Sequence, residues 1–125
     1  MKTFATMQDD RLAEILAAFG GLRIAIVGDF FLDKYLDVDP SLAEVSIETG
    51  KTAHQVVAVR HSPGAAGTVV GNLAALGVRT LHAVGFCGND GEGFELVADL
   101  EQLGCSVRHM HRAADRQTPT YLKPC

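Results

Sequence analysis

A run of small residues that leads directly into a helical pattern constrains this chain more than any other feature. It reads Ser-Pro-Gly-Ala-Ala-Gly-Thr-Val-Val-Gly-Asn-Leu-Ala-Ala-Leu-Gly and covers residues 62–77. Pro63 fixes one backbone angle, and residues 64–67 after it carry almost no side chain. Such a segment lets a ligand, or another part of the protein, approach the backbone closely.

The second half of this run predicts a helix. Val69, Leu73 and Leu76 recur at helical spacing, and Gly77 stands where a helix C′ glycine is expected. A loop of small residues that opens into a helix presents free N–H groups, which favours a small polar ligand. Close packing of a helix on a sheet would need the same small residues. No Walker sequence and no Gly-x-Gly-x-x-Gly occurs, so the pattern does not specify a nucleotide.

Length and charge narrow the class of protein. With 125 residues and 47% hydrophobic residues, the chain is expected to form at most one domain. The net charge of −4 argues against nucleic acid as the main partner, because no basic stripe is available to neutralise phosphates. Three cysteines without CxxC spacing, no apolar signal segment and no membrane-length apolar run predict a cytoplasmic protein.

The N-terminal part predicts a helix followed by a strand. Apolar residues at helical spacing lie between residues 9 and 19, with Asp9 and Asp10 as candidate N-caps. Residues 23–28 then read as a strand that is buried on both faces. Asp29 and Asp33 follow this strand, and open α/β sheets bind their ligands at that end of a strand. The alternative for Asp29 is that it only caps a turn.

The middle of the chain departs from this alternation of helix and strand. Residues 45–51 alternate apolar and polar side chains and turn at Thr49-Gly50, which predicts a half-exposed antiparallel hairpin within residues 36–61. A hairpin inserted just before the small-residue run suits a lid or a dimer surface.

The alternation of strands and helices then resumes and continues to the end of the chain. Strands are expected over residues 80–86, 105–111 and 118–123. A helix with Phe94, Val97, Leu100 and Leu103 on its apolar face fits between the first two, with Asn89-Asp90-Gly91 as its cap. A β-α-β-α-β progression that halts as a new strand begins resembles a fold cut after its first half.

These parts, in this order, resemble the N-terminal half of the PfkB (ribokinase-like) carbohydrate kinases. The matching pieces are residues 27–35 (Val-Gly-Asp-Phe-Phe-Leu-Asp-Lys-Tyr), the lid-like insertion, residues 63–77 and residues 84–93 (Val-Gly-Phe-Cys-Gly-Asn-Asp-Gly-Glu-Gly). Within that family, the Gly-Asp-x-x-Leu-Asp opening looks most like the heptose phosphate kinases.

The resemblance implies a fold and an activity. The fold would be a three-layer α/β/α, Rossmann-like sandwich with a small β lid at about residues 36–61, of which residues 1–125 form the N-terminal portion. The activity would be transfer of the ATP γ-phosphoryl group, with Mg²⁺, to a hydroxyl of a sugar or sugar phosphate. The substrate-binding residues would be Asp33, supported by Asp29, and the loop positions Gly64, Ala65 and Thr68. The lid would close over the sugar and pair with a second subunit.

Two departures from the family pattern affect this interpretation. Ala65 stands where the family usually has a second glycine, and Thr68 stands where it usually has asparagine, which carries two amide donors in place of one hydroxyl. The catalytic aspartate and the ATP pocket of the family would lie beyond Cys125. We therefore expect no catalytic residue, bound cofactor or metal ligand in these 125 residues, and no activity from them alone.

Two other classes of function remain open at this point. One is a non-catalytic, Rossmann-like ligand-binding or regulatory domain that uses the same small-residue run. The other is an interaction module whose lid strands mediate pairing. His109 and His111 share one strand face, but without a third ligand they favour no metal site.

Overall fold

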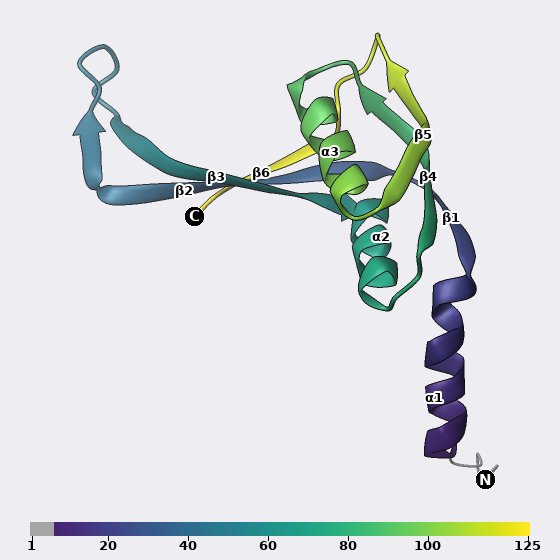
Figure 1. Ribbon diagram of the computed structural model, residues 1–125. Helices are drawn as coiled ribbons and strands as arrows, with labels where there is room; N and C mark the ends of the chain where they lie inside the picture. The colour runs from purple at the N-terminus through teal and green to yellow at the C-terminus, as the bar shows by residue number, and fades with distance from the viewer. Residues whose placement is uncertain (1–6) are drawn as a thin grey trace, which may run out of the picture.

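The computed structural model describes residues 7–125 and groups their strands into two three-stranded sheets (Figure 1). The body sheet has the order β1-β4-β5 and is parallel, whereas the lid sheet has the order β3-β2-β6 and is mixed. The elements are α1 (Asp9–Ala18), a 3₁₀ turn (Phe19–Gly21), β1 (Arg23–Val27), β2 (Phe30–Val45), β3 (Thr52–Ala65), α2 (Ala66–Ala75), β4 (Thr80–Gly88), α3 (Gly91–Gln102), β5 (Cys105–Ala113) and β6 (Thr120–Pro124).

The core lies where α2 and α3 pack on the body sheet. Both helices follow the alternation of strand and helix that favours parallel pairing, and both end at glycines with positive φ, Gly77 and Gly104. The largest fully buried side chains come from β2, β4 and the two helices, namely Phe30, Leu32, Val70, Cys87, Leu96 and Leu100. Cys87 and Cys105 are both buried, and their thiols are free.

The helices bury faces that are rotated from those the sequence predicted. In α2, Val70 is fully buried and the predicted Leu73 packs against the core, while Val69 and Leu76 are about half exposed. In α3, Leu96 is fully buried, whereas Phe94 is 67% exposed. Apolar spacing identified both helices, and the predicted inner positions Val97 and Leu100 of α3 are buried. It wrongly placed Val69, Leu76 and Phe94 on the inner faces.

Two predictions about the N-terminal part were wrong. The cap of α1 is Gln8, not Asp9 or Asp10, and α1 buries none of its residues as it projects from the body (Figure 1). The strand β1 is not buried on both faces, since only Ile26 is buried and Val27 is 77% exposed. Among the described residues β1 is an edge strand, and only one of its neighbouring positions in the sheet is filled, by β4.

The lid is longer than the sequence predicted. The strands β2 and β3 pair antiparallel from Phe30 opposite Ala65 out to Val45 opposite Thr52, and the ribbon they form reaches far from the body (Figure 1). The predicted turn at Thr49-Gly50 is confirmed. The last strand, β6, pairs parallel with β2 and joins the base of the ribbon.

A buried polar contact fixes the segment that leads into β6. Asp90 is the N-cap of α3, as predicted, and its Oδ1 accepts a hydrogen bond of 2.8 Å from the Gly93 N–H. The same carboxylate accepts hydrogen bonds from the backbone N–H and the hydroxyl of Thr118, at 2.8 and 2.6 Å. Thr118 is only 5% exposed and accepts in turn from the Gly88 N–H. No local sequence pattern assigns Thr118 a role.

These contacts make Asp90 a stabilising residue with a defined pH dependence. Hydrogen bonds from Thr118 lower the pKa of Asp90 below its ordinary value. The folded state therefore holds this proton less tightly than the unfolded state. The stability that Asp90 contributes is present above the ordinary carboxyl pKa of about 4 and is lost as the pH falls through the lowered value.

We expect Asp90→Ala to lower the free energy of unfolding by about 2–3 kcal/mol at neutral pH, because it removes a helix cap and two further hydrogen bonds. The matched control is Asp10→Ala in the first turn of α1, which should change stability by less than about 0.5 kcal/mol. Urea unfolding from pH 7 down to pH 3 measures both. A difference between wild type and Asp90→Ala that did not shrink at low pH would contradict the assignment.

Candidate functional site

Asp33 and Gly64 lie against each other at the base of the lid. Successive side chains of a strand point to opposite faces, so Asp33 and Lys34 of β2 face different sides of the lid sheet. A Cβ atom built on Gly64 would lie 2.7 Å from Oδ2 of Asp33. Because real Cβ atoms are not found so close, only glycine at position 64 leaves room for this carboxylate. The two residues that the resemblance assigned to the sugar are thus brought together.

Lys123 is a neighbour of Asp33 that sequence reasoning missed. Its Nζ donates a 2.9 Å hydrogen bond to Oδ1 of Asp33, and it lies 4.8 and 5.2 Å from the ring centroids of Tyr35 and Tyr121. The hydrogen bond to Asp33 raises the pKa of Lys123. Pairing between β2 and β6 brings these residues together across 90 positions of the sequence, and no local pattern indicates such a pairing.

The small-residue run is not a free loop. Pro63, Gly64 and Ala65 are the last residues of β3, and α2 begins at the next residue. Ala65 makes the change of direction with φ of 51° and ψ of −116°, a backbone conformation that favours glycine. No side chain caps α2, so the predicted presentation of N–H groups at its start stays compatible with the structure.

Asp29 and Thr68 lie on either side of this junction. The backbone carbonyl of Asp29 accepts a 2.9 Å hydrogen bond from the Ala66 N–H, which ties the end of β1 to the first turn of α2. Thr68 is exposed, and its hydroxyl donates to the Pro63 carbonyl over 3.4 Å. Asp29 therefore supports the junction through its backbone, and Thr68 contacts the small-residue run itself.

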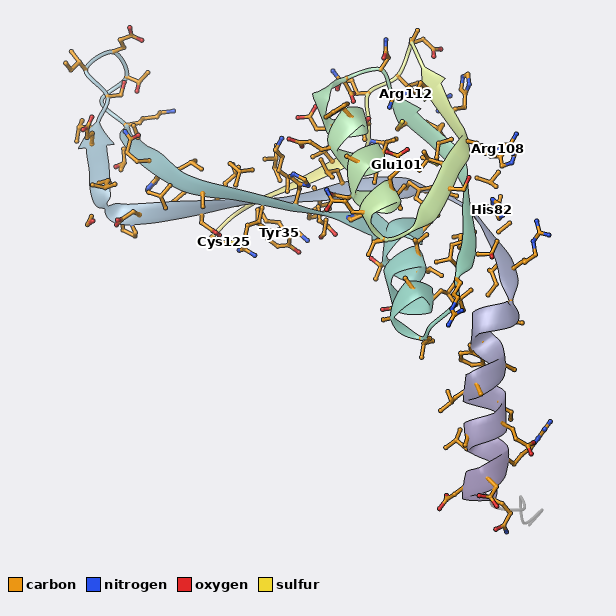
Figure 2. The ribbon with its side chains drawn as sticks, in the orientation of Figure 1. Tyr35, His82, Glu101, Arg108, Arg112 and Cys125 are labelled. Atoms are coloured by element: carbon orange, nitrogen blue, oxygen red, sulfur yellow. The ribbon has the colours of Figure 1, made fainter. Side chains whose placement is uncertain are left out.

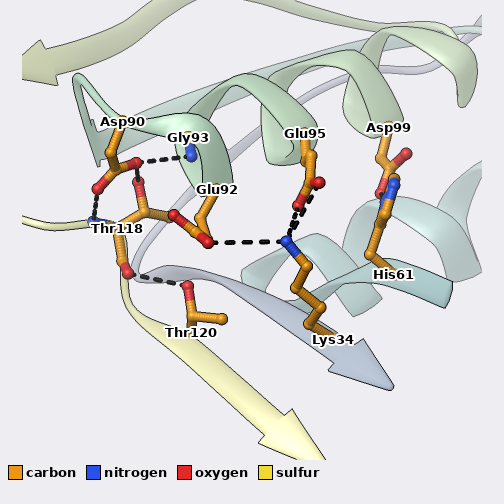
Figure 3. Close-up of polar contacts among 9 residues, drawn as sticks. All are labelled: Lys34, His61, Asp90, Glu92, Gly93, Glu95, Asp99, Thr118 and Thr120. Atoms are coloured by element: carbon orange, nitrogen blue, oxygen red, sulfur yellow. Dashed lines mark hydrogen bonds and ion pairs between the residues drawn. The ribbon is translucent and has the colours of Figure 1, made fainter. Parts of the chain in front are cut away.

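The opposite face of the lid base rests on an acidic stripe of α3, formed by Glu92, Glu95 and Asp99 (Figure 3). Lys34 reaches Glu95 at 2.9 Å and Glu92 at 3.6 Å, and the hydrogen bond to Glu95 raises the pKa of Lys34. His61 of β3 lies 2.7 Å from Asp99. These contacts hold the lid base on the body while Asp33 faces away from α3.

A second ion pair lies farther out on the Asp33 face. Arg60 donates two hydrogen bonds to Asp37, at 2.8 and 2.9 Å, and lowers the pKa of that carboxyl. Arg60 also lies over the ring of Tyr35, 5.2 Å from its centroid. Figure 2 shows Tyr35 midway along the ribbon, near Cys125, whose backbone pairs with Leu36.

The rest of the described chain offers little metal-binding chemistry. Within residues 7–125, no three His, Cys, Asp or Glu side chains gather as a metal site would require. His82 of β4 and His109 of β5 lie with their ring centroids 6.4 Å apart. No helix in the described range is both long and apolar enough to cross a membrane.

The arrangement can bind a polyol. A carboxylate accepts hydrogen bonds from hydroxyls, and an ammonium and backbone N–H groups donate to hydroxyl oxygens. Gly64 is buried and leaves room for the carboxylate. The contacts described here place Asp33, Gly64 and Lys123 together and put Ala65 beside Gly64 in sequence and on the strand. They do not bring the side chains of Asp29 or Thr68 to Asp33.

Comparison with known proteins gives relatives by sequence. Bifunctional protein HldE of Methylobacillus flagellatus is 34% identical over 97 residues, which cover 78% of this chain and 19% of the relative. Bifunctional protein HldE of Hyphomonas neptunium is 35% identical over 121 residues, which cover 90% and 22%. The chain thus spans about a fifth of the length of these curated relatives. No protein-family model matches it.

Solved structures show the same fold. A carbohydrate kinase from Agrobacterium tumefaciens superposes with a TM-score of 0.60 at 18% identity, covering 82% of this chain and 31% of the kinase. A fructokinase with bound ATP from Xylella fastidiosa gives 0.56 at 20% identity, covering 80% and 28%. The predicted ribokinase-like fold class is confirmed, and so is the resemblance to the PfkB carbohydrate kinases.

The strained junction at Ala65 predicts a stabilising substitution. Ala65→Gly removes a Cβ from a backbone conformation that costs an alanine roughly 1–2 kcal/mol, so we expect the free energy of unfolding to rise by about 1 kcal/mol. Ala75→Gly, at an exposed position in the last turn of α2, is the control and should lower stability by up to about 1 kcal/mol. Equal effects of the two substitutions in chemical unfolding would count against strain at Ala65.

Proposed function

We propose that this chain, which shares the fold of the ribokinase-like carbohydrate kinases, is the N-terminal, sugar-binding part of such an enzyme. The complete enzyme would transfer the γ-phosphoryl group of ATP to a hydroxyl of a sugar or sugar phosphate. A heptose phosphate is the first candidate, because residues 28–33 resemble the opening of the heptose phosphate kinases. The three free cysteines agree with the reducing cytoplasm that we propose as its location.

One observation carries this proposal. The carboxylate of Asp33 lies over Gly64, within 2.7 Å of where any side chain at position 64 would begin. Gly64 is itself buried, and its missing side chain gives the Asp33 carboxylate room to lie at the end of the small-residue run, where it would accept hydrogen bonds from a hydroxylated ligand. Gly64, Ala65 and Thr68 would form the floor of the site, with Asp29 as support.

ATP and Mg²⁺ belong to the complete enzyme in this proposal. One structural neighbour, the Xylella fastidiosa fructokinase, was solved with bound ATP. The described residues of this chain offer no cluster of metal ligands, and we assign them no step of phosphoryl transfer. The role of this part would be to bind and orient the acceptor sugar.

The binding proposal makes a direct prediction for Gly64. Gly64→Ala should displace the Asp33 carboxylate and raise the dissociation constant for a heptose phosphate by about tenfold or more, the value of a lost charge-assisted hydrogen bond. Asp33→Ala should do the same. Gly91→Ala is the matched control, because a Cβ on Gly91 meets nothing within 4 Å.

Isothermal titration of the purified chain with a heptose phosphate measures these constants. Thermal unfolding of each variant separates lost binding from lost folding. We also expect no ATP-dependent phosphorylation of the sugar by these 125 residues. Unchanged affinity of Gly64→Ala, or binding of a nucleotide in place of the sugar, would favour the Rossmann-like regulatory domain as the function.

The lid carries an apolar face that supports the proposed pairing of two subunits. Beyond the part that α3 covers, Leu36 pairs with Val59 and Val38 with Val56 on one face of the lid sheet. Val59 and Val56 are about half exposed, and a groove of about 360 Å³ lies over Leu36, Val38 and Val56. Exposed apolar patches of this kind mark protein contacts.

Val59→Lys places a charge in the middle of this face, and we expect it to convert a dimer to a monomer. Ala58→Lys is the control, because Ala58 lies opposite Asp37 on the other face. Sedimentation of wild type and both variants over a range of concentrations measures whether each is a monomer or a dimer. A wild-type chain that stays monomeric at every concentration would show that this lid does not pair.

A further inference from the structure

Lys123 is held in one orientation by groups from two strands. Its ammonium donates to Oδ1 of Asp33 at 2.9 Å and to the Tyr35 hydroxyl at 3.4 Å. The rings of Tyr35 and Tyr121 lie 4.8 and 5.2 Å from it, within the range of a cation–π contact. The side chains of Lys123 and Asp33 are 36% and 25% exposed, so the pair is accessible to a ligand.

Because of the contact with Lys123, the two carboxylate oxygens of Asp33 face different neighbours. Oδ1 accepts from Lys123, and Oδ2 is the oxygen turned toward Gly64. A free aspartate side chain rotates about two bonds. The bond to Lys123 restricts this rotation and fixes which oxygen points at the small-residue run.

A partly exposed ion pair adds little to the free energy of unfolding, so stability alone does not explain why Lys123 lies beside Asp33. An ammonium has three N–H donors, and the contacts with Asp33 and Tyr35 account for two of them. The remaining donor lies beside an acceptor carboxylate. A donor and an acceptor held next to each other match two neighbouring oxygens of a sugar, where one hydroxyl donates and the next oxygen accepts.

We propose that Lys123 is a positioning and specificity-determining residue of this site, which holds Asp33 and donates to the sugar oxygen next to the hydroxyl that Asp33 binds. The inference rests on the sugar-binding function proposed above and adds the strand β6 to the site. The ligand class it selects is a polyol with adjacent oxygens, phosphorylated or not.

The chain contains a matched control for this role. Arg60 is also a cation on the Asp33 face and also lies over Tyr35, at 5.2 Å from the ring centroid, but its carboxylate partner is Asp37. Removing either cation costs one ion pair and one contact with Tyr35. Only the loss of Lys123 should affect Asp33.

The first experiment measures binding of a heptose phosphate, and of the same heptose without phosphate, to wild type, Lys123→Met, Lys123→Arg and Arg60→Met. We expect Lys123→Met to weaken binding of both sugars by about tenfold or more, Lys123→Arg to restore part of it, and Arg60→Met to change it less than about twofold. Thermal unfolding shows whether each variant is folded. Equal affinities for Lys123→Met and Arg60→Met would overturn the proposal.

The second experiment needs no ligand. The side-chain nitrogen of Lys123 is titrated by NMR in wild type and in Asp33→Asn, where loss of the hydrogen bond should lower the raised pKa of Lys123. A pKa unchanged by Asp33→Asn would overturn the pairing on which the role depends. If the pairing is present but wild type binds neither sugar, the sugar-binding function has failed and the ligand role of Lys123 fails with it.

Discussion

The abrupt change from strand to helix at Ala65 is the constraint on which the rest of this structure depends. Pairing of β2 with β3 runs without a break from Asp37 opposite Ala58 to Phe30 opposite Ala65, and α2 begins at Ala66. One residue must therefore turn the chain, and Ala65 does so at positive φ. Because the lid strand and the body helix share this junction, the position of Gly64 under Asp33 follows from sheet register and needs no separate loop.

Alternation along β2 then assigns separate tasks to neighbouring residues. Lys34 faces the acidic stripe of α3 and joins His61 in holding the lid base to the body. Asp33 and Tyr35 face the other side, where Lys123 of β6 donates a hydrogen bond to each of them. The contact between Asp90 and Thr118 positions the segment that enters β6. A polar network on the covered side of the sheet therefore determines the geometry on the exposed side.

Local sequence patterns predicted most elements of the fold but not its longest contacts. Helical spacing found α2 and α3 and the buried Val97 and Leu100, yet it missed Val70 and Leu96, because inner faces depend on where each helix meets the sheet. The pairing of Asp33 with Gly64 followed from a resemblance, since no spacing rule joins residues 31 positions apart. The contacts of Lys123 and Thr118 could not be predicted from the sequence, because the parallel pairing of β6 with β2 leaves no local signal.

The two departures from the family pattern have different physical consequences. Ala65 keeps a backbone conformation suited to glycine, so that substitution changes strain and leaves the path of the chain intact. Thr68 stands where the family usually has an asparagine, and its shorter side chain contacts the Pro63 carbonyl at 3.4 Å, so in the proposed site a sugar would lack a long amide donor on this side. In the proposed site, the donor would instead be a group beside Asp33. Lys123 is that group, and its ammonium approaches from β6, on the strand that pairs with the opposite edge of β2 from Gly64.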